Sequence, residues 1–66
     1  MELKRVRQYL GYSQVLVSVA TGVSVYRIAA AENNRIQLND VERSVLEDFY
    51  KSKLRMLAEL QPGGGR

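Results

Sequence analysis

The sequence predicts an all-α protein, a compact helical domain of four to five helices that ends in a long helix. Two observations carry this prediction. Serines stand directly before two short apolar runs, where helix N-caps are expected. From Asp40 to Leu60 no glycine or proline interrupts apolar residues at three- and four-residue steps. We assign residues 1–60 to one domain and residues 61–66 to a flexible tail rich in glycine.

Size and composition restrict the function classes open to this chain. It has 66 residues and a net charge of +3, and it contains neither cysteine nor histidine. Disulfides, the usual zinc sites and histidine-based acid–base catalysis are therefore excluded. We expect no enzyme, no catalytic residues, no metal and no cofactor. So short a chain buries only about 60% of its unfolded surface, which favours a partner subunit.

The excess positive charge lies in the first half of the chain. Residues 1–38 hold five basic and two acidic residues, whereas residues 39–66 hold five of each. This asymmetry suits a first half that faces a polyanion, and ordinary solvated charge accounts for it equally. No apolar run reaches the ~18 residues of a membrane span, and the charged start lacks the apolar run of a signal peptide. We expect a cytoplasmic protein without a membrane partner.

Residues 2–10 are predicted to form the first helix. Leu3, Val6 and Leu10 make one apolar stripe at helical spacing. Gly11 is a suitable stop for this helix. Basic residues lie off the stripe and are expected to face solvent or a ligand; they are Lys4, Arg5 and Arg7.

Residues 13–34 admit two interpretations, a β-hairpin or a pair of helices. Valines alternate on both sides of the dipeptide Thr21-Gly22, and β-branched valine favours strands. On propensity alone the two interpretations are balanced. However, Thr-Gly is not one of the strong two-residue hairpin turns, and Gly22 can end a helix in the left-handed conformation.

Caps and alanines favour the pair of helices. Ser13 and Ser24 each precede an apolar run, as N-caps do. The run Ala29-Ala30-Ala31 has the highest helix propensity available. We therefore predict helices over residues 14–20 and 25–32. Their short linker fits the turn of a helix-turn-helix, a motif that binds DNA.

The last helix is predicted to begin after Asn39, a strong N-cap. Glu42, three residues later, approximates a capping box. The pattern that follows fits one long helix, or two helices that break near residues 50–52. Its apolar arc is too wide for one small core to cover, which indicates a contact between molecules. The residues predicted for dimerisation are Val45, Phe49, Tyr50, Leu54 and Leu57.

Several cap, turn and helix-end residues match a known family in register. They are Ser13-Gln14, Thr21-Gly22-Val23-Ser24, Ile28 and Glu32-Asn33. These residues resemble the helix-turn-helix of phage-repressor-like (Cro- and XRE-type) DNA-binding domains, over roughly residues 1–50. The resemblance implies a lambda-repressor-like domain that inserts the helix over residues 25–32 into the major groove. The chain departs from the family on the outer face of residues 14–20, which is apolar here.

The resemblance also implies a DNA-binding surface. We expect Arg27 to bind a guanine bidentately or to contact a phosphate. Tyr26 would meet a phosphate or a thymine methyl, and Gln14 and Arg35 would contact phosphates and set the position of the domain. Glu32 is expected to be structural and to bond helix-terminal groups, Arg27 or Arg35. The full set, with Ala29 and Ala30 on the exposed face, is Gln14, Ser24, Val25, Tyr26, Arg27, Ala29, Ala30, Asn33, Asn34 and Arg35.

Two functions are therefore expected. The first is a sequence-specific transcriptional regulator of repressor type, which binds a palindromic operator in double-stranded DNA as a homodimer at the nucleoid. The second is a protein-interaction module with the same fold, an antitoxin or anti-repressor subunit. It would bind a protein partner through its C-terminal helix or through the apolar face that carries Val15, Leu16 and Val19.

Overall fold

Four helices make up residues 1–60, the part of the chain that the computed structural model describes. They are α1 (Leu3–Leu10), α2 (Gln14–Thr21), α3 (Val25–Glu32) and α4 (Asp40–Leu60). No strand occurs among these residues, so the predicted all-α class is confirmed and the hairpin interpretation is wrong. The predicted flexible tail, residues 61–66, lies outside the described residues.

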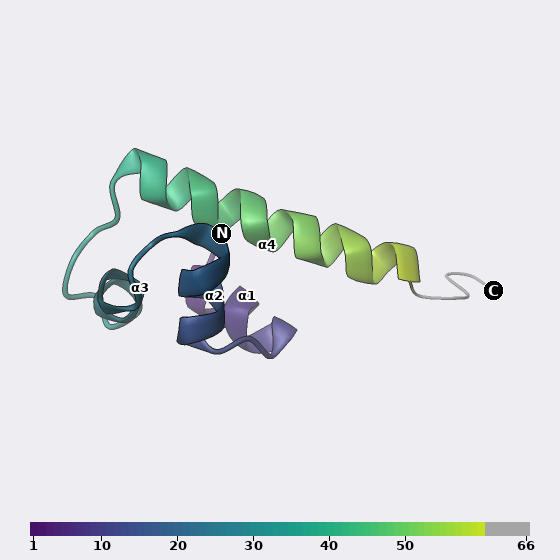
Figure 1. Ribbon diagram of the computed structural model, residues 1–66, viewed down its shortest axis with the longest axis horizontal. Coiled ribbons are helices and arrows are strands. Elements are labelled where there is room, and N and C mark those ends of the chain that lie inside the picture. The colour runs from purple at the N-terminus through teal and green to yellow at the C-terminus, as the bar shows by residue number, and fades with distance from the viewer. Residues whose placement is uncertain (61–66) are drawn as a thin grey trace.

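The long helix α4 runs the length of the molecule, and the three short helices lie along one side of it (Figure 1). α1 and α2 both pack against α4, and α2 also packs against α3. The C-terminal part of α4 extends past the other helices (Figure 1). Within residues 1–60, no helix combines the length and the hydropathy needed to cross a membrane. The buried core cluster consists of Val17, Val23, Ile28, Leu46 and Tyr50.

Side-chain caps begin α2 and α3 where the sequence predicts them. The Ser13 Oγ accepts the Leu16 N–H at 3.0 Å, and the Ser24 Oγ accepts the Arg27 N–H at 3.1 Å. α2 ends at Gly22, which has a φ of +82°. A Cβ on Gly22 would meet no atom within 4 Å, so glycine is favoured here by its backbone freedom and not by lack of space.

The alternating valines of α2 divide between its two faces. Val17 lies in the core, while Val15 and Val19 are exposed, Val19 to 82%. Val15 and Val19 are one helical turn apart and therefore share a face, whereas Val17 points the opposite way. Alternating valines, which are typical of a strand, therefore also occur in this helix. They give it one valine in the core and two on an apolar outer face.

α4 is a single helix without a break at residues 50–52. It begins with a reciprocal capping box, as the sequence predicts. The Glu42 N–H donates to the Asn39 Oδ1 at 2.7 Å, and the Asn39 N–H donates to the Glu42 Oε1 at 3.0 Å. This box fixes the position of the Glu42 carboxylate at the start of the helix.

We expect Leu46→Ala to lower the free energy of unfolding by about 2–5 kcal/mol, because it leaves a cavity in the core. Leu46 is fully buried between α4 and the short helices. Urea unfolding followed by circular dichroism measures the change. Val41→Ala is the control, since Val41 is exposed on the same helix and its truncation should stay within about 0.5 kcal/mol. Equal losses for both variants would contradict the assignment of Leu46 to the core.

Candidate nucleic-acid interface

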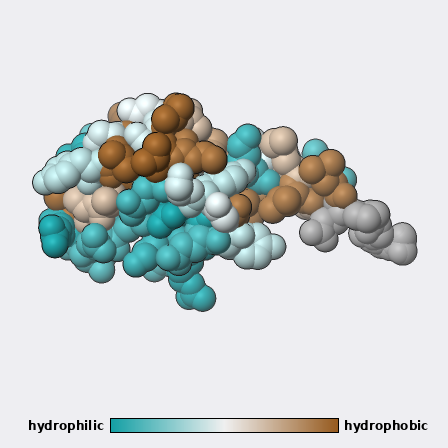
Figure 2. Space-filling view, turned by 60° about the horizontal axis from the view of Figure 1, so that its bottom comes forward, coloured by the Kyte–Doolittle hydropathy of each residue, from teal (hydrophilic) through white to brown (hydrophobic). Residues whose placement is uncertain are grey.

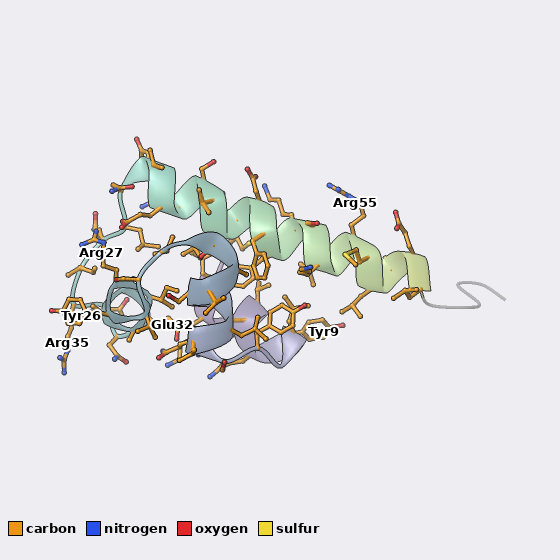
Figure 3. The ribbon with its side chains drawn as sticks, in the orientation of Figure 1. Tyr9, Tyr26, Arg27, Glu32, Arg35 and Arg55 are labelled. Atoms are coloured by element: carbon orange, nitrogen blue, oxygen red, sulfur yellow. The ribbon has the colours of Figure 1, made fainter. Side chains whose placement is uncertain are left out.

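The exposed side of α3 brings together most of the residues predicted to bind DNA. Figure 3 shows Tyr26, Arg27 and Arg35 at one end of the molecule, away from Tyr9 and Arg55. A shallow hollow of about 160 Å³ lies in this surface. It is lined by Tyr26, Ala29, Ala30, Asn33 and Arg35, all from the predicted set.

Ala30 is a correction to the predicted surface. It is only 6% exposed, so it forms part of the floor of the hollow and does not project from the helix. The chain folds back directly after α3, where Asn34 takes a left-handed φ of +61°. The Arg35 N–H then donates to the Ala30 carbonyl at 2.8 Å, which brings the loop beside Ala30.

Arg27 forms an ion pair with Glu42. The Arg27 Nε donates to one carboxylate oxygen of Glu42, and the Arg27 Nη2 donates to the other at 2.9 Å. The hydrogen bond to Glu42 raises the pKa of Arg27. The hydrogen bonds from Arg27 and the Asn39 N–H hold the pKa of Glu42 below its ordinary value. The pair fastens the first turn of α3 to the first turn of α4.

A second ion pair joins the three short helices. The Arg7 Nε and Nη2 on α1 donate to the two carboxylate oxygens of Glu32 at the end of α3, at 2.7 and 2.8 Å. The Arg7 Nη1 donates to the Tyr12 carbonyl at 2.7 Å. The Gln14 amide, at the start of α2, donates to the same Glu32 at 2.9 Å.

The Arg7–Glu32 pair corrects two predictions. Arg7 does not face solvent, since its side chain is 12% exposed and that of Glu32 only 7%. Glu32 is structural, as expected, but its partners are Arg7 and Gln14 and not Arg27 or Arg35. Gln14, predicted to contact a phosphate, directs its amide into this network.

The network keeps Glu32 ionised. Burial alone would raise the pKa of Glu32, but the hydrogen bonds from Arg7 and Gln14, together with the positive charges of Arg7 and Lys4, outweigh burial and lower it. The pKa of Arg7 is raised by the hydrogen bond to Glu32. Burial also raises the pKa of the neighbouring Tyr50 to about 12, so its phenol stays neutral at physiological pH.

The remaining predicted DNA-binding residues are at or near the same surface. Ser24 is exposed and caps α3, Val25 follows it in the first turn, and Asn33 and Asn34 are exposed at the other end of the helix. Sequence reasoning missed Glu42 as a partner of this surface. Its only local signal is the capping box, which does not disclose a partner 15 residues away.

The predicted dimerisation surface requires a correction at Tyr50. This side chain is 1% exposed and belongs to the core of the chain, so it is not offered to a second molecule. Phe49 packs against the same core. Val45 and Leu57 are exposed, and Leu54 is half-buried. In Figure 2, hydrophobic side chains gather over the body of the molecule and again along the end of α4.

A larger open hollow of about 540 Å³ lies between the start of α1, the loop after α3 and α4. Its floor includes Ile28 and Leu46, and Lys4, Arg5 and Arg43 also line it. Within residues 1–60, no group of three or more acidic, histidine or cysteine residues is placed to hold a metal ion.

Comparisons with known proteins add no family to this geometry. A scan against protein-family models and searches of curated proteins and solved structures found no significant match. The resemblance to phage-repressor-like domains therefore stays a hypothesis.

We expect Glu32→Gln to lower the free energy of unfolding at pH 7 by about 1–3 kcal/mol, because it leaves Arg7 without its carboxylate. The pKa of Glu32 is lowered by folding, so its carboxylate stabilises the fold above pH ~4.3 and less as pH falls through the lowered pKa. Urea unfolding between neutral and acidic pH measures the difference between variant and wild type, which should shrink in acid.

Glu59→Gln is the control for this prediction. Glu59 is exposed near the end of α4 and should change the free energy of unfolding by no more than about 0.5 kcal/mol. A difference between wild type and Glu32→Gln that stays constant from pH 7 into acid would contradict the role given to the ionised carboxylate.

Proposed function

We propose that this protein is a sequence-specific DNA-binding regulator that inserts α3 into the major groove. The observation that carries the proposal is the exposed side of α3, where Tyr26, Arg27 and Arg35 lie at one end of the molecule (Figure 3). In this proposal α2, the turn over residues 22–24 and α3 act as a helix-turn-helix, with α2 packed behind α3.

The dimensions and side chains of α3 suit the major groove. An α-helix with its side chains is about 10–12 Å across, and the major groove of B-DNA is about 12 Å wide and admits a helix. Ala29 carries only a methyl group and allows close approach. Arg35, with Asn33 and Asn34, lies just beyond the helix, where phosphate contacts would fix its register.

Hydrogen-bonding groups are sparse on this surface, which affects how a site would be recognised. The two charged residues of α3, Arg27 and Glu32, are both paired within the chain. Tyr26 and Val25 offer one hydroxyl and one apolar contact, the latter suited to a thymine methyl. We therefore expect DNA shape to contribute to specificity together with a small number of base contacts.

We also propose that the protein binds as a homodimer. One domain of this size offers few contacts, whereas two domains would read half-sites about 34–36 Å apart on the same face of the duplex. The part of the predicted surface near the end of α4 consists of the exposed Leu57 and the half-buried Leu54, one helical turn before it. The end of α4 extends past the other helices, where a second copy can reach it (Figure 1).

The apolar outer face of α2 favours a second candidate function. Val15, Leu16 and Val19 are all exposed on one helix, and adjacent exposed apolar side chains mark protein interaction sites. In this alternative the fold is that of an antitoxin or anti-repressor subunit that binds a protein through α2. DNA selection separates the two functions: enrichment of a sequence supports the regulator, and no binding to any duplex at low salt supports the interaction module.

For DNA binding we expect Arg35→Ala to weaken a selected site and random duplex about equally, by roughly 3- to 10-fold. The slope of log affinity against log salt should fall by about one, since one phosphate contact is lost. Fluorescence anisotropy across salt concentrations measures both quantities. The control is Arg55→Ala, which removes the same charge from α4, away from α3 (Figure 3). Equal effects of the two variants would contradict the assignment of the interface to α3.

For the dimer we expect Leu57→Glu to shift sedimentation equilibrium at tens of micromolar from dimer to monomer, because a carboxylate would be buried in an apolar contact. Val41→Glu is the control, since Val41 is exposed at the opposite end of α4. A wild-type protein that sediments as a monomer both alone and with DNA would contradict dimerisation.

A further inference from the structure

The guanidinium of Arg27 is held in one orientation. Glu42 uses both carboxylate oxygens on it, one for Nε and one for Nη2. Arginine carries five N–H donors in a rigid planar arrangement. The two contacts therefore use the Nε and Nη2 donors along one side of the guanidinium. N–H groups of Nη1 and Nη2 remain at its end. Within residues 1–60, Nη1 has no hydrogen-bond partner, and the side chain is 39% exposed.

Glu42 is itself fixed, so it can act as a rigid support. Its Oε1 accepts the Asn39 N–H at 3.0 Å, and its own N–H donates to the Asn39 Oδ1 at 2.7 Å. The Glu42 side chain is 16% exposed, less than that of Arg27. An arginine that rests on a carboxylate anchored to backbone loses little conformational freedom when it binds a further partner.

The same pair makes Arg27 a poor contact for phosphate and a good one for a base edge. Glu42 compensates the charge of Arg27, so the pair has little net attraction for a polyanion. The pair instead offers two neighbouring N–H donors at the end of a side chain that is held in one orientation. In the major groove, guanine presents two neighbouring acceptors, O6 and N7, which can accept these two donors together.

We propose that Glu42 is a positioning residue that orients Arg27 to read one guanine. This inference rests on the proposed DNA-binding function and adds to it both the base that Arg27 recognises and the residue that prepares Arg27 for it. Glu42 itself does not touch the DNA. Its role is to fix the direction of the guanidinium before the complex forms.

The test uses Glu42→Gln, which removes the charge and keeps an acceptor for the capping box, because glutamine also occupies this position in capping boxes. A duplex is first selected from random DNA with the wild-type protein. We expect Glu42→Gln to bind the selected duplex about 10-fold more weakly, within the range of one bidentate guanine contact. Binding to random duplex should be unchanged or tighter, since one negative charge is lost. Glu59→Gln, which removes the same charge from the end of α4, should leave the ratio of the two affinities unchanged.

A second measurement replaces each guanine of the selected duplex in turn with 7-deazaguanine, which lacks the N7 acceptor. Wild-type protein should lose about 10-fold in affinity at one position in each half-site, and Glu42→Gln should lose much less at the same position. A wild-type protein that is insensitive to every replacement overturns the inference, even if Glu42→Gln has lost its fold. Equal sensitivity of both proteins, or tighter binding of Glu42→Gln to both duplexes, also overturns it. Failure of the wild-type protein to bind any duplex instead overturns the proposed function, and this inference with it.

Discussion

The ion pair between Arg7 and Glu32 is the contact on which the arrangement of the short helices depends. α1, α2 and α3 have eight residues each, and isolated helices of this length are not stable in water. Apolar contacts hold them together, and the ion pair adds a directional contact to this packing. A nearly buried guanidinium and carboxylate require their partners, because any arrangement that separates them leaves an unpaired charge in the interior. Gln14 adds α2 to this pair, so one network sets the relation of all three helices.

Two ion pairs also determine which side chains α3 leaves exposed. The only charged residues of this helix are Arg27 and Glu32, one in its first turn and one at its end. Each is paired within the chain, so the helix is fastened at both ends to other elements. The exposed side of α3 then presents the Tyr26 ring, the Ala29 methyl group and the end of the Arg27 guanidinium. With few donors, this surface fits the proposed DNA binding through shape and one oriented contact better than through nonspecific attraction to phosphates.

Much of the fold was predictable because its signals are local. The caps at Ser13 and Ser24 and the box of Asn39 with Glu42 each join residues three positions apart, so the sequence alone discloses them. The partners of Arg7 and Glu32 were not predictable in the same way. They lie 25 residues apart, and no spacing rule selects one basic residue among several as the partner of a distant carboxylate.

The sequence by itself indicated where the helices begin, because caps, helical spacing and left-handed glycines act within four or five residues. It favoured helices over a hairpin in residues 13–34, and it left open whether residues 40–60 form one helix or two. Only the tertiary structure decided which charges are paired and which apolar residues are covered. It placed Tyr50 in the core and left Leu57 exposed, although both lie on α4 and both were predicted to meet a second molecule. The physical reason is that burial depends on where the other helices end: α4 continues beyond them (Figure 1), so its last apolar residues are left exposed.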